Sequence, residues 1–283
     1  MRSAGHPRAI ATVAVMTTNS IRTAGRQAYK IGNAQFVYGN DHLQAFFAEL
    51  GLDPARGYFV LRASALGDAP SEVVGSAFGF FPRAMVAKIV ERSRAAHAPH
   101  RVLAVAVPHL AAVAHSVFGD GGEIAELADR FGAAAQAAPL EARTMATAWS
   151  SVEWPEGAAA QLLRHATVLR EHRGDSHLMA IASLGLSPIH AILINAGRRG
   201  DAPAQSAKSR GYRSDDIDPA VAALVDRGAL TADGELSDIG LSLWEDIEAA
   251  TDRANAGAWA ALGNGLESTI TLAKDVVAAA NWG

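Results

Sequence analysis

The sequence contains no cysteine. It therefore cannot form disulfide bridges, bind a metal through thiolates or use a cysteine nucleophile. Aromatic residues make up only 6% of the chain, whereas alanine accounts for roughly a fifth of it. Alanine has the highest helix propensity, and its small side chain allows helices to approach closely. The composition therefore predicts a mostly α-helical protein.

The chain also lacks an excess of positive charge. Its 25 Lys and Arg residues stand against 29 Asp and Glu residues, which gives a net charge of -4. A generally basic nucleic-acid-binding protein is thereby excluded, although a local basic patch is not. Hydrophobic residues make up 49% of the sequence, which is enough to build a globular core. The 283 residues allow one large domain or two of ordinary size.

Long apolar runs are missing as well. No run approaches the ~18 residues that a membrane span requires, so no membrane association is expected. Residues 2–20 combine a basic start with a modest apolar stretch, but this weak signal-peptide pattern lacks a clean cleavage site. We therefore expect a cytoplasmic protein and interpret the polar residues 1–30 as a poorly ordered extension.

Two regions are predicted after this extension. Residues 31–184 form a helical domain, because apolar residues recur there at helical spacing between Gly- and Pro-containing turns. Within it, the apolar stretch Val102–Phe118 carries Pro108 near its middle and is expected to form two pieces. Residues 185–283 form a second domain that resembles a winged helix and ends in a C-terminal helix.

The second region has the element order of a winged helix-turn-helix. The predicted elements are a helix over 188–196, a short helix over 202–209, a third helix over 217–227, two very short strands around an Asp233-Gly234 turn, and a long helix over 238–255. The predicted fold class is thus mostly α, a multi-helical N-terminal part with a C-terminal winged helix-turn-helix and a short two-stranded wing. The segment from Arg227 to Gly240 resembles the multiple-antibiotic-resistance (MarR) class of regulators.

The charges of this region argue against DNA binding. The helix that would enter the major groove is acidic, with Asp215, Asp216, Asp218 and Asp226. A groove-reading helix normally presents Arg, Lys, Asn or Gln to the bases and phosphates. The only local positive patch is formed by Lys208, Arg210 and Arg213, which would contact DNA in a regulator or else simply balance the acidic helix. Nucleic acid is therefore disfavoured as a partner, although DNA binding by a regulator remains the alternative.

The densest group of polar residues is Arg170-Glu171-His172-Arg173-Gly174-Asp175-Ser176-His177. It lies between two apolar helical stretches, and Gly174 is expected to end the first helix while Asp175 or Ser176 caps the next. One interpretation is a helix corner whose charges satisfy one another. The other is a ligand site, in which His172, His177 and Glu171 perform acid–base catalysis and Arg170, Arg173 and Asp175 bind the ligand.

Further residues are expected near this motif. His165 lies seven residues before His172 and therefore on nearly the same side of a helix. Phe78 and Phe81 belong to an aromatic cluster that would line the same pocket. No metal site is predicted, because the His-x-x-x-His and His-Glu-x-x-His spacings are absent. Haem on a single histidine such as His109, His115 or His165 is not excluded, and the cofactor is otherwise unknown.

A family resemblance rests on this motif. Trp154-Pro155, His165 and the Glu-His-Arg-Gly-Asp-x-His string that ends at His177 resemble an actinobacterial family whose members carry a helix-turn-helix label. The resemblance covers roughly residues 31–262 and implies a compact, mostly helical protein that ends in a winged helix, without a firmly assigned reaction. We expect a protein that binds a small-molecule ligand or substrate, including the case of an enzyme of secondary metabolism. The alternative is a MarR-like transcriptional regulator, and in either case the segments 238–255 and 266–277 are candidates for a homodimer contact.

Overall fold

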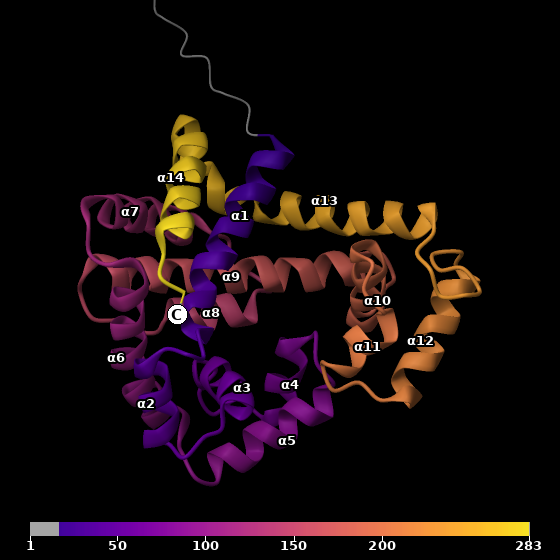
Figure 1. Ribbon diagram of the computed structural model, residues 1–283, viewed down its shortest axis with the longest axis horizontal. Helices are drawn as coiled ribbons and strands as arrows, with labels where there is room; N and C mark the ends of the chain where they lie inside the picture. Colours follow the sequence, from indigo (N-terminus) through magenta and orange to yellow (C-terminus); the bar gives the residue numbers. More distant parts are fainter. Residues whose placement is uncertain (1–16, 283) are drawn as a thin grey trace, which may run out of the picture.

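The computed structural model describes residues 17–282, which are mostly helical (Figure 1). The helices in this part of the chain are α1 (Thr18–Gly32), α2 (Asp41–Glu49), α3 (Pro54–Ser64), α4 (Ser71–Phe78), α5 (Arg83–Arg94), α6 (Pro99–Phe118), α7 (Gly122–Ala137), α8 (Thr144–Ser150), α9 (Ala158–Ser183), α10 (Pro188–Arg199), α11 (Pro203–Lys208), α12 (Ser214–Asp226), α13 (Asp238–Ala260) and α14 (Leu266–Ala279). Two short 3-10 helices, η1 (Asn33–Phe36) and η2 (Gly263–Gly265), follow α1 and α13. The prediction of a mostly α-helical protein is confirmed.

Helix α9 is the central element of the fold. It crosses the middle of the molecule beside α13 (Figure 1), and it packs against α1, α6, α7, α8 and α13. The predicted helix break at Gly174 is wrong, because α9 continues through it to Ser183. A glycine inside a helix costs only about 1 kcal/mol, which packing on several neighbouring helices readily offsets. The polar motif therefore lies in mid-helix rather than at a corner.

The buried apolar residues form two clusters. The larger one unites α1 to α8, the first half of α9, the end of α13 and α14. The smaller one joins the end of α9 at Ile181 to α10, α11, α12 and Ile247 of α13. Because α9 and α13 contribute to both clusters, they connect the two parts of the molecule. The predicted division between residues 184 and 185 stays a prediction.

The N-terminal extension was predicted incorrectly where the structure describes it. Residues 18–32 form α1, whose N-cap is Thr17, the side chain of which accepts the N–H of Ser20. Its residues Ile21, Ala24 and Ile31 are buried at helical spacing, and the helix packs against α9, α13 and α14. The expected loose segment is therefore part of the core. Residues 1–16, which include the apolar stretch of the signal-peptide pattern, lie outside the described residues.

Helix α6 also departs from the prediction. It is one continuous helix of 20 residues with Pro108 inside it, not two pieces. Pro108 and Ala104 are exposed, so water can solvate the carbonyl group that proline leaves without a donor. Against the expectation of no such run, α6 is the one helix of residues 17–282 that is long and apolar enough by composition to cross a membrane. Its buried face, which includes Val102 and Leu110, belongs to the larger core cluster.

The C-terminal region contains the predicted helix-turn-helix order but not the predicted wing. Helices α10, α11 and α12 are followed by a turn and then by α13. Residues 17–282 contain no β-strand, and the wing is reduced to one antiparallel bridge between Leu230 and Leu236 around Gly234. The two segments on either side of this turn are too short to form a ladder. Helix α14, a candidate for dimerisation, packs against α1 and α7 of the same chain, and the homodimer stays a prediction.

Candidate functional site

A cavity of about 640 Å³ lies between the two parts of the molecule. Its walls come from α1, α3, the end of α4 with the loop that follows it, the middle of α9, and from α10, α11 and α13. Helix α9 supplies most of the polar motif, namely Arg170, Glu171, Arg173, Gly174, Asp175 and His177. Pockets of this size bind drug-sized organic molecules. The cavity is therefore the candidate functional site.

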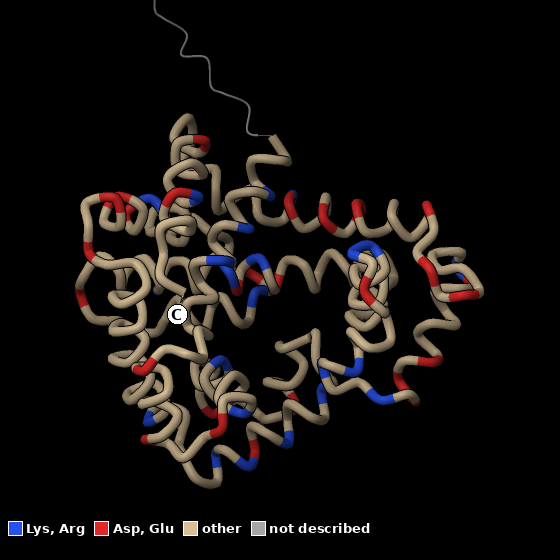
Figure 2. The backbone as a smooth tube through the Cα atoms, viewed as in Figure 1, with Lys and Arg blue, Asp and Glu red and all other residues tan. Residues whose placement is uncertain are grey.

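The lining of this cavity is strongly basic. Eight Lys or Arg side chains line it, against three carboxylates. The basic residues are Arg26, Lys30, Arg62, Arg170, Arg173, Arg198, Arg199 and Arg210, and the carboxylates are Glu171, Asp175 and Glu248. Figure 2 shows blue segments grouped on α1 and the middle of α9, while red segments follow α12 and α13. The positive charge that the whole chain lacks is thus concentrated in one cavity.

Glu171 is held between two arginines. Its carboxylate accepts two hydrogen bonds from Arg62, at 3.0 and 2.7 Å, and a third from Arg170. All three side chains are buried. Burial alone would raise the pKa of Glu171, but the charges and hydrogen bonds of the two guanidinium groups outweigh it and lower the pKa. Glu171 therefore stays ionised and serves as the counter-ion of the two arginines.

A second carboxylate, Glu248 of α13, ties α1 and α9 together. It accepts hydrogen bonds from Arg173 at 3.1 and 3.2 Å and from Arg26 at 3.1 Å. Burial raises its pKa, but the positive charge of Arg173 first, and that of Arg26 after it, lower the pKa overall. Nearby, Arg22 donates to Asp252 at 2.7 Å. This cluster fixes one wall of the cavity.

Asp175 is the unusual acid of the cavity. One of its carboxylate oxygens accepts the backbone N–H groups of Met145 and Ala146, each at 3.0 Å. Asp175 thus caps the start of α8, not a new helix after Gly174 as predicted. Burial raises its pKa to about 7, and the nearby charge of Glu171 adds to this, although the two N–H groups act in the opposite direction. Asp175 is therefore the carboxyl group of the cavity that exchanges a proton near neutral pH.

His177 is held by α13. Its Nδ1 lies 2.8 Å from the hydroxyl of Thr251, and its ring faces that of Phe80 at a centroid distance of 5.7 Å. Burial and the positive charge of Arg173 lower the pKa of His177 to about 4. The ring is therefore neutral at physiological pH and a poor proton acceptor for catalysis.

Three basic side chains of the cavity have no carboxylate partner among residues 17–282. The guanidinium of Arg198 lies 4.2 Å from the ring centroid of Trp244, and that of Arg210 lies 5.8 Å from the ring centroid of Phe81. Lys30, near the end of α1, is exposed and forms no ion pair with another described residue. Cation–π contacts orient a guanidinium without neutralising its charge. Arg198 and Arg210 are thus held in place with their charge still available to a ligand.

An aromatic wall completes the cavity. Phe78, Phe80 and Phe81 line it where α4 ends and α5 begins, together with Tyr58 of α3. Gly79 has a φ of 57°, and a side chain there would collide with Leu178 at 2.4 Å. Only glycine permits this close approach, which places Phe80 against α9. The cavity therefore combines an aromatic wall with positive charge.

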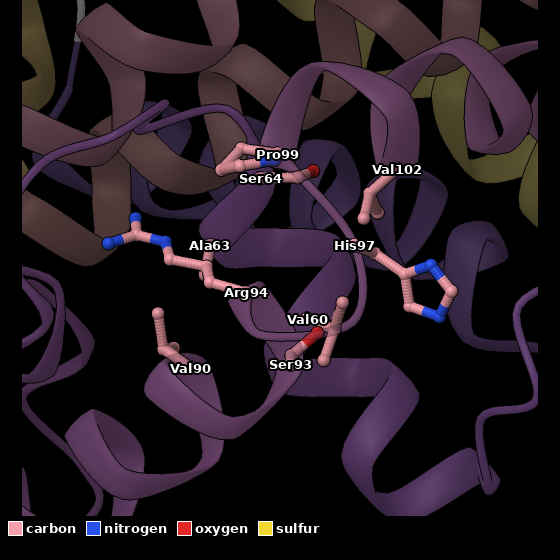
Figure 3. Close-up of a pocket in the computed structure, with 9 residues that line it drawn as sticks. All are labelled: Val60, Ala63, Ser64, Val90, Ser93, Arg94, His97, Pro99 and Val102. Carbon is pink, nitrogen blue, oxygen red and sulfur yellow. The ribbon is translucent and has the colours of Figure 1, made fainter.

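A second cavity, lined by residues of α3, α5 and α6, has a volume of only about 10 Å³ (Figure 3). That is enough for about one water molecule. Its Arg94 is engaged by the backbone carbonyls of Gly67 and Ala69, and its His97 by that of Leu50. This cavity is too small and its polar groups too well paired for a ligand site.

The comparison with protein families identifies the chain. The model of a helix-turn-helix family matches residues 26–282. The chain belongs to this family. No curated protein and no solved structure matches it. The match begins inside α1 and extends through α14, so membership in the helix-turn-helix family applies to both parts of the molecule and not only to α10–α13.

The structure brings most of the predicted site residues of this helix-turn-helix protein to the cavity. Arg170, Glu171, Arg173, Asp175, His177, Phe78, Phe81 and Arg210 all line it. His172 does not, because it is fully buried with its ring nitrogens 3.0 Å from oxygen atoms of Asn255 and Pro139. His165 packs on α7 with Nδ1 3.0 Å from the carbonyl of Ala128. The expected common side for His165 and His172 thus faces neighbouring helices, not the cavity.

The remaining predicted residues lie elsewhere. Lys208 and Arg213 are exposed beside α12 and do not line the cavity. His115 contacts Asp120 at 2.6 Å and His109 lies 3.5 Å from Glu49, both away from the cavity. In residues 17–282, no three His, Asp or Glu side chains are placed to hold a metal ion.

Sequence reasoning missed several cavity residues. Arg26 and Lys30 lie in the segment interpreted from the sequence as a poorly ordered extension, and Arg62 lies in the predicted helical domain, where no local motif singles it out. The buried residues of α1 recur at helical spacing after Thr17, which is the signal that identifies this helix. The role of Glu248 has no comparable local signal, because its partners lie on α1 and α9.

Proposed function

We propose that this helix-turn-helix family protein binds an anionic small molecule in the cavity between its two parts. The observation that carries the proposal is the charge of the lining, eight basic side chains against three carboxylates in about 640 Å³. Glu171 and Glu248 are already engaged by arginines, so they do not neutralise Arg198, Arg210 or Lys30. A bound carboxylate, sulfonate or phosphate would supply the missing charge.

The experiment is a thermal-shift panel on the whole chain. Carboxylates, sulfonates and phosphates are compared with matched neutral amides or esters, because only the anions gain from the unpaired cations. We expect anions to raise the melting temperature and the neutral analogues to do so far less. The double variant Arg198→Gln/Arg210→Gln should lose the anion effect. The matched control is Arg56→Gln, which removes an exposed arginine paired with Asp53 outside the cavity. Absence of any anion effect, or an effect that the double variant keeps, contradicts the proposal.

Acid–base catalysis has less support than binding. Glu171 is fixed as a counter-ion, His177 is neutral with a low pKa, and His172 lies outside the cavity. Asp175 remains as one titratable acid without a partner base in the cavity. We therefore propose ligand binding without an enzymatic reaction, which the match to the helix-turn-helix family does not support either.

DNA binding is the second candidate function, and the family assignment favours it. The order of α10, α11, α12 and α13 fits a helix-turn-helix, although residues 17–282 form no two-stranded wing. The exposed face of α12, however, carries Asp215, Asp216, Asp218 and Asp226. These charges would repel the phosphates that a groove-reading helix approaches. Any DNA contact therefore depends on Lys208, Arg210 and Arg213 beside that helix.

A mobility-shift assay against the DNA upstream of the protein's own coding sequence tests this candidate. It is run at two salt concentrations, since phosphate contacts make the affinity fall as salt rises. Binding at low salt that weakens at high salt, and that is lost in a Lys208→Gln/Arg213→Gln variant, supports regulation. If the cavity ligand and the DNA both bind, each should change the affinity of the other by the same factor. The absence of a shift contradicts the regulatory candidate without affecting ligand binding.

A further inference from the structure

The proton on the His177 ring can be placed from its neighbours. The hydroxyl of Thr251 donates its single proton to the carbonyl of Ile247 at 2.7 Å. It therefore has only its lone pairs to offer to His177, whose Nδ1 lies 2.8 Å away. The carboxylate of Glu248, an acceptor, is also on this side, 3.9 Å from Nδ1. The Nδ1 atom must consequently carry the hydrogen.

This assignment leaves Nε2 as a bare acceptor. A neutral imidazole has one N–H, so Nε2 carries a lone pair. Nε2 makes no hydrogen bond within residues 17–282, and the side chain is 18% exposed where it lines the cavity. Its low pKa keeps it neutral near pH 7. Because His177 lines the cavity and its Nδ1 is occupied by Thr251, Nε2 is the ring nitrogen left to accept a hydrogen bond from a ligand.

The acceptor is unusual in its surroundings. Most charged groups of the cavity are cations, which only donate hydrogen bonds, while Glu171 and Glu248 are engaged by arginines and Asp175 by two backbone N–H groups of α8. A ligand that offered nothing but acidic groups would leave Nε2 unpaired. Phe80 also lines the cavity, and its ring lies beside that of His177 with the two ring planes tilted by 32°. Aromatic rings of a ligand pack favourably against aromatic side chains.

We propose that the ligand is a planar aromatic acid that also carries a hydroxyl group, which donates a hydrogen bond to Nε2 of His177. This inference rests on the proposed function, because it assumes that an anion occupies the cavity. The acidic group lies towards Arg198 or Arg210, and the ring lies against Phe80. His177 is a specificity-determining residue here and not a catalytic one.

Two probes that differ by one hydroxyl test the inference. Isothermal titration calorimetry at pH 7 measures the dissociation constants of 2-naphthoate and of 6-hydroxy-2-naphthoate, in which the hydroxyl is remote from the carboxylate. In the natural protein we expect the hydroxylated acid to bind about tenfold more tightly, the effect of one additional hydrogen bond to a group that is otherwise left unpaired. The measured quantity is the ratio of the two dissociation constants, which a general loss of stability does not change.

Variants assign the ratio to His177. His177→Phe keeps an aromatic ring against Phe80 but removes Nε2, and should bring the ratio within about twofold of one. If His177→Phe fails to fold, Thr251→Val serves as the second variant. Valine is nearly the same size as threonine but removes the acceptor that fixes the ring proton of His177, so this variant should also reduce the ratio. His165→Gln, a histidine outside the cavity, is the matched control and should keep the ratio.

The outcomes separate the two proposals. A ratio near one in the natural protein, or a ratio that survives His177→Phe, overturns the inference about the hydroxyl group. If the double variant Arg198→Gln/Arg210→Gln still weakens both acids in that case, anion binding stands. If neither naphthoate binds at millimolar concentration while other anions of the panel do, the aromatic class is wrong. If no anion binds at all, both proposals fall.

Discussion

Replacing Glu171 by glutamine should destabilise the protein strongly, although the side chain keeps its size and shape. Glu171 is 2% exposed and compensates the charges of Arg62 and Arg170, which are 7% and 6% exposed. Glutamine cannot neutralise two guanidinium groups, and its amide N–H₂ would face one of them. The change therefore leaves two buried cations without a counter-ion between them.

Breaking a buried ion pair by removing one partner costs about 3–5 kcal/mol of unfolding free energy. Glu171 has two arginine partners, so we expect a loss at the upper end of this range. The control is Glu126→Gln, which removes the exposed partner of Arg130 four residues further along α7. Exposed pairs of this kind contribute about 1 kcal/mol or less. Both variants replace a glutamate that is paired with arginine by glutamine, so the difference between their losses of unfolding free energy measures the effect of burial.

Urea denaturation followed by circular dichroism measures both free energies. The pKa of Glu171 is lowered from its usual value of 4.5, so its contribution to stability is complete above that pH and is lost as the pH falls further. The difference between natural protein and Glu171→Gln should therefore narrow in acid. A loss no larger than that of Glu126→Gln, or a difference that does not change below pH 4, would refute the electrostatic role of Glu171.

Three further predictions concern single positions. The variant Asp175→Asn keeps an oxygen acceptor for the start of α8 but cannot ionise. Because folding raises the pKa of Asp175 from 3.8 to about 7, the natural protein should lose stability relative to this variant as the pH rises from 4 to 8. Stability curves of the two proteins that run parallel over this pH range would contradict the prediction. Gly240→Ala should cost about 1–3 kcal/mol because its new methyl would lie 2.3 Å from the backbone oxygen of Ala229, whereas Gly122→Ala, with no atom nearby, should be neutral or stabilising in the same urea assay. Pro108→Ala should raise the melting temperature, since proline in a helix interior costs about 3 kcal/mol relative to alanine. An unchanged or lower melting temperature would contradict this, because it would mean that solvation of the Ala104 carbonyl fully offsets the cost of the proline.

The sequence predicted local features well where the signal was local. The helix predicted to begin at residue 188 is α10, which begins at Pro188, and the helix predicted to end at residue 227 is α12, which ends at Asp226. It misjudged Gly174 and Pro108, because residues that usually interrupt helices are tolerated when packing or solvation offsets their cost. The Asp233-Gly234 turn formed, but two adjacent strands did not, since a turn signal does not supply the residues that a ladder needs.

The candidate site divides in the same way. The order of residues along the chain was sufficient to single out the motif from Arg170 to His177, because no other segment combines so many charged and histidine residues within one apolar region. Only the tertiary structure decided what each member does. Asp175 caps a helix more than twenty residues before it in the chain, and His172 faces away from the cavity while His177 lines it. The counter-ions and unpaired cations come from α1, α3, α10 and α13, and charge compensation depends on distances in space that spacing along the chain does not contain.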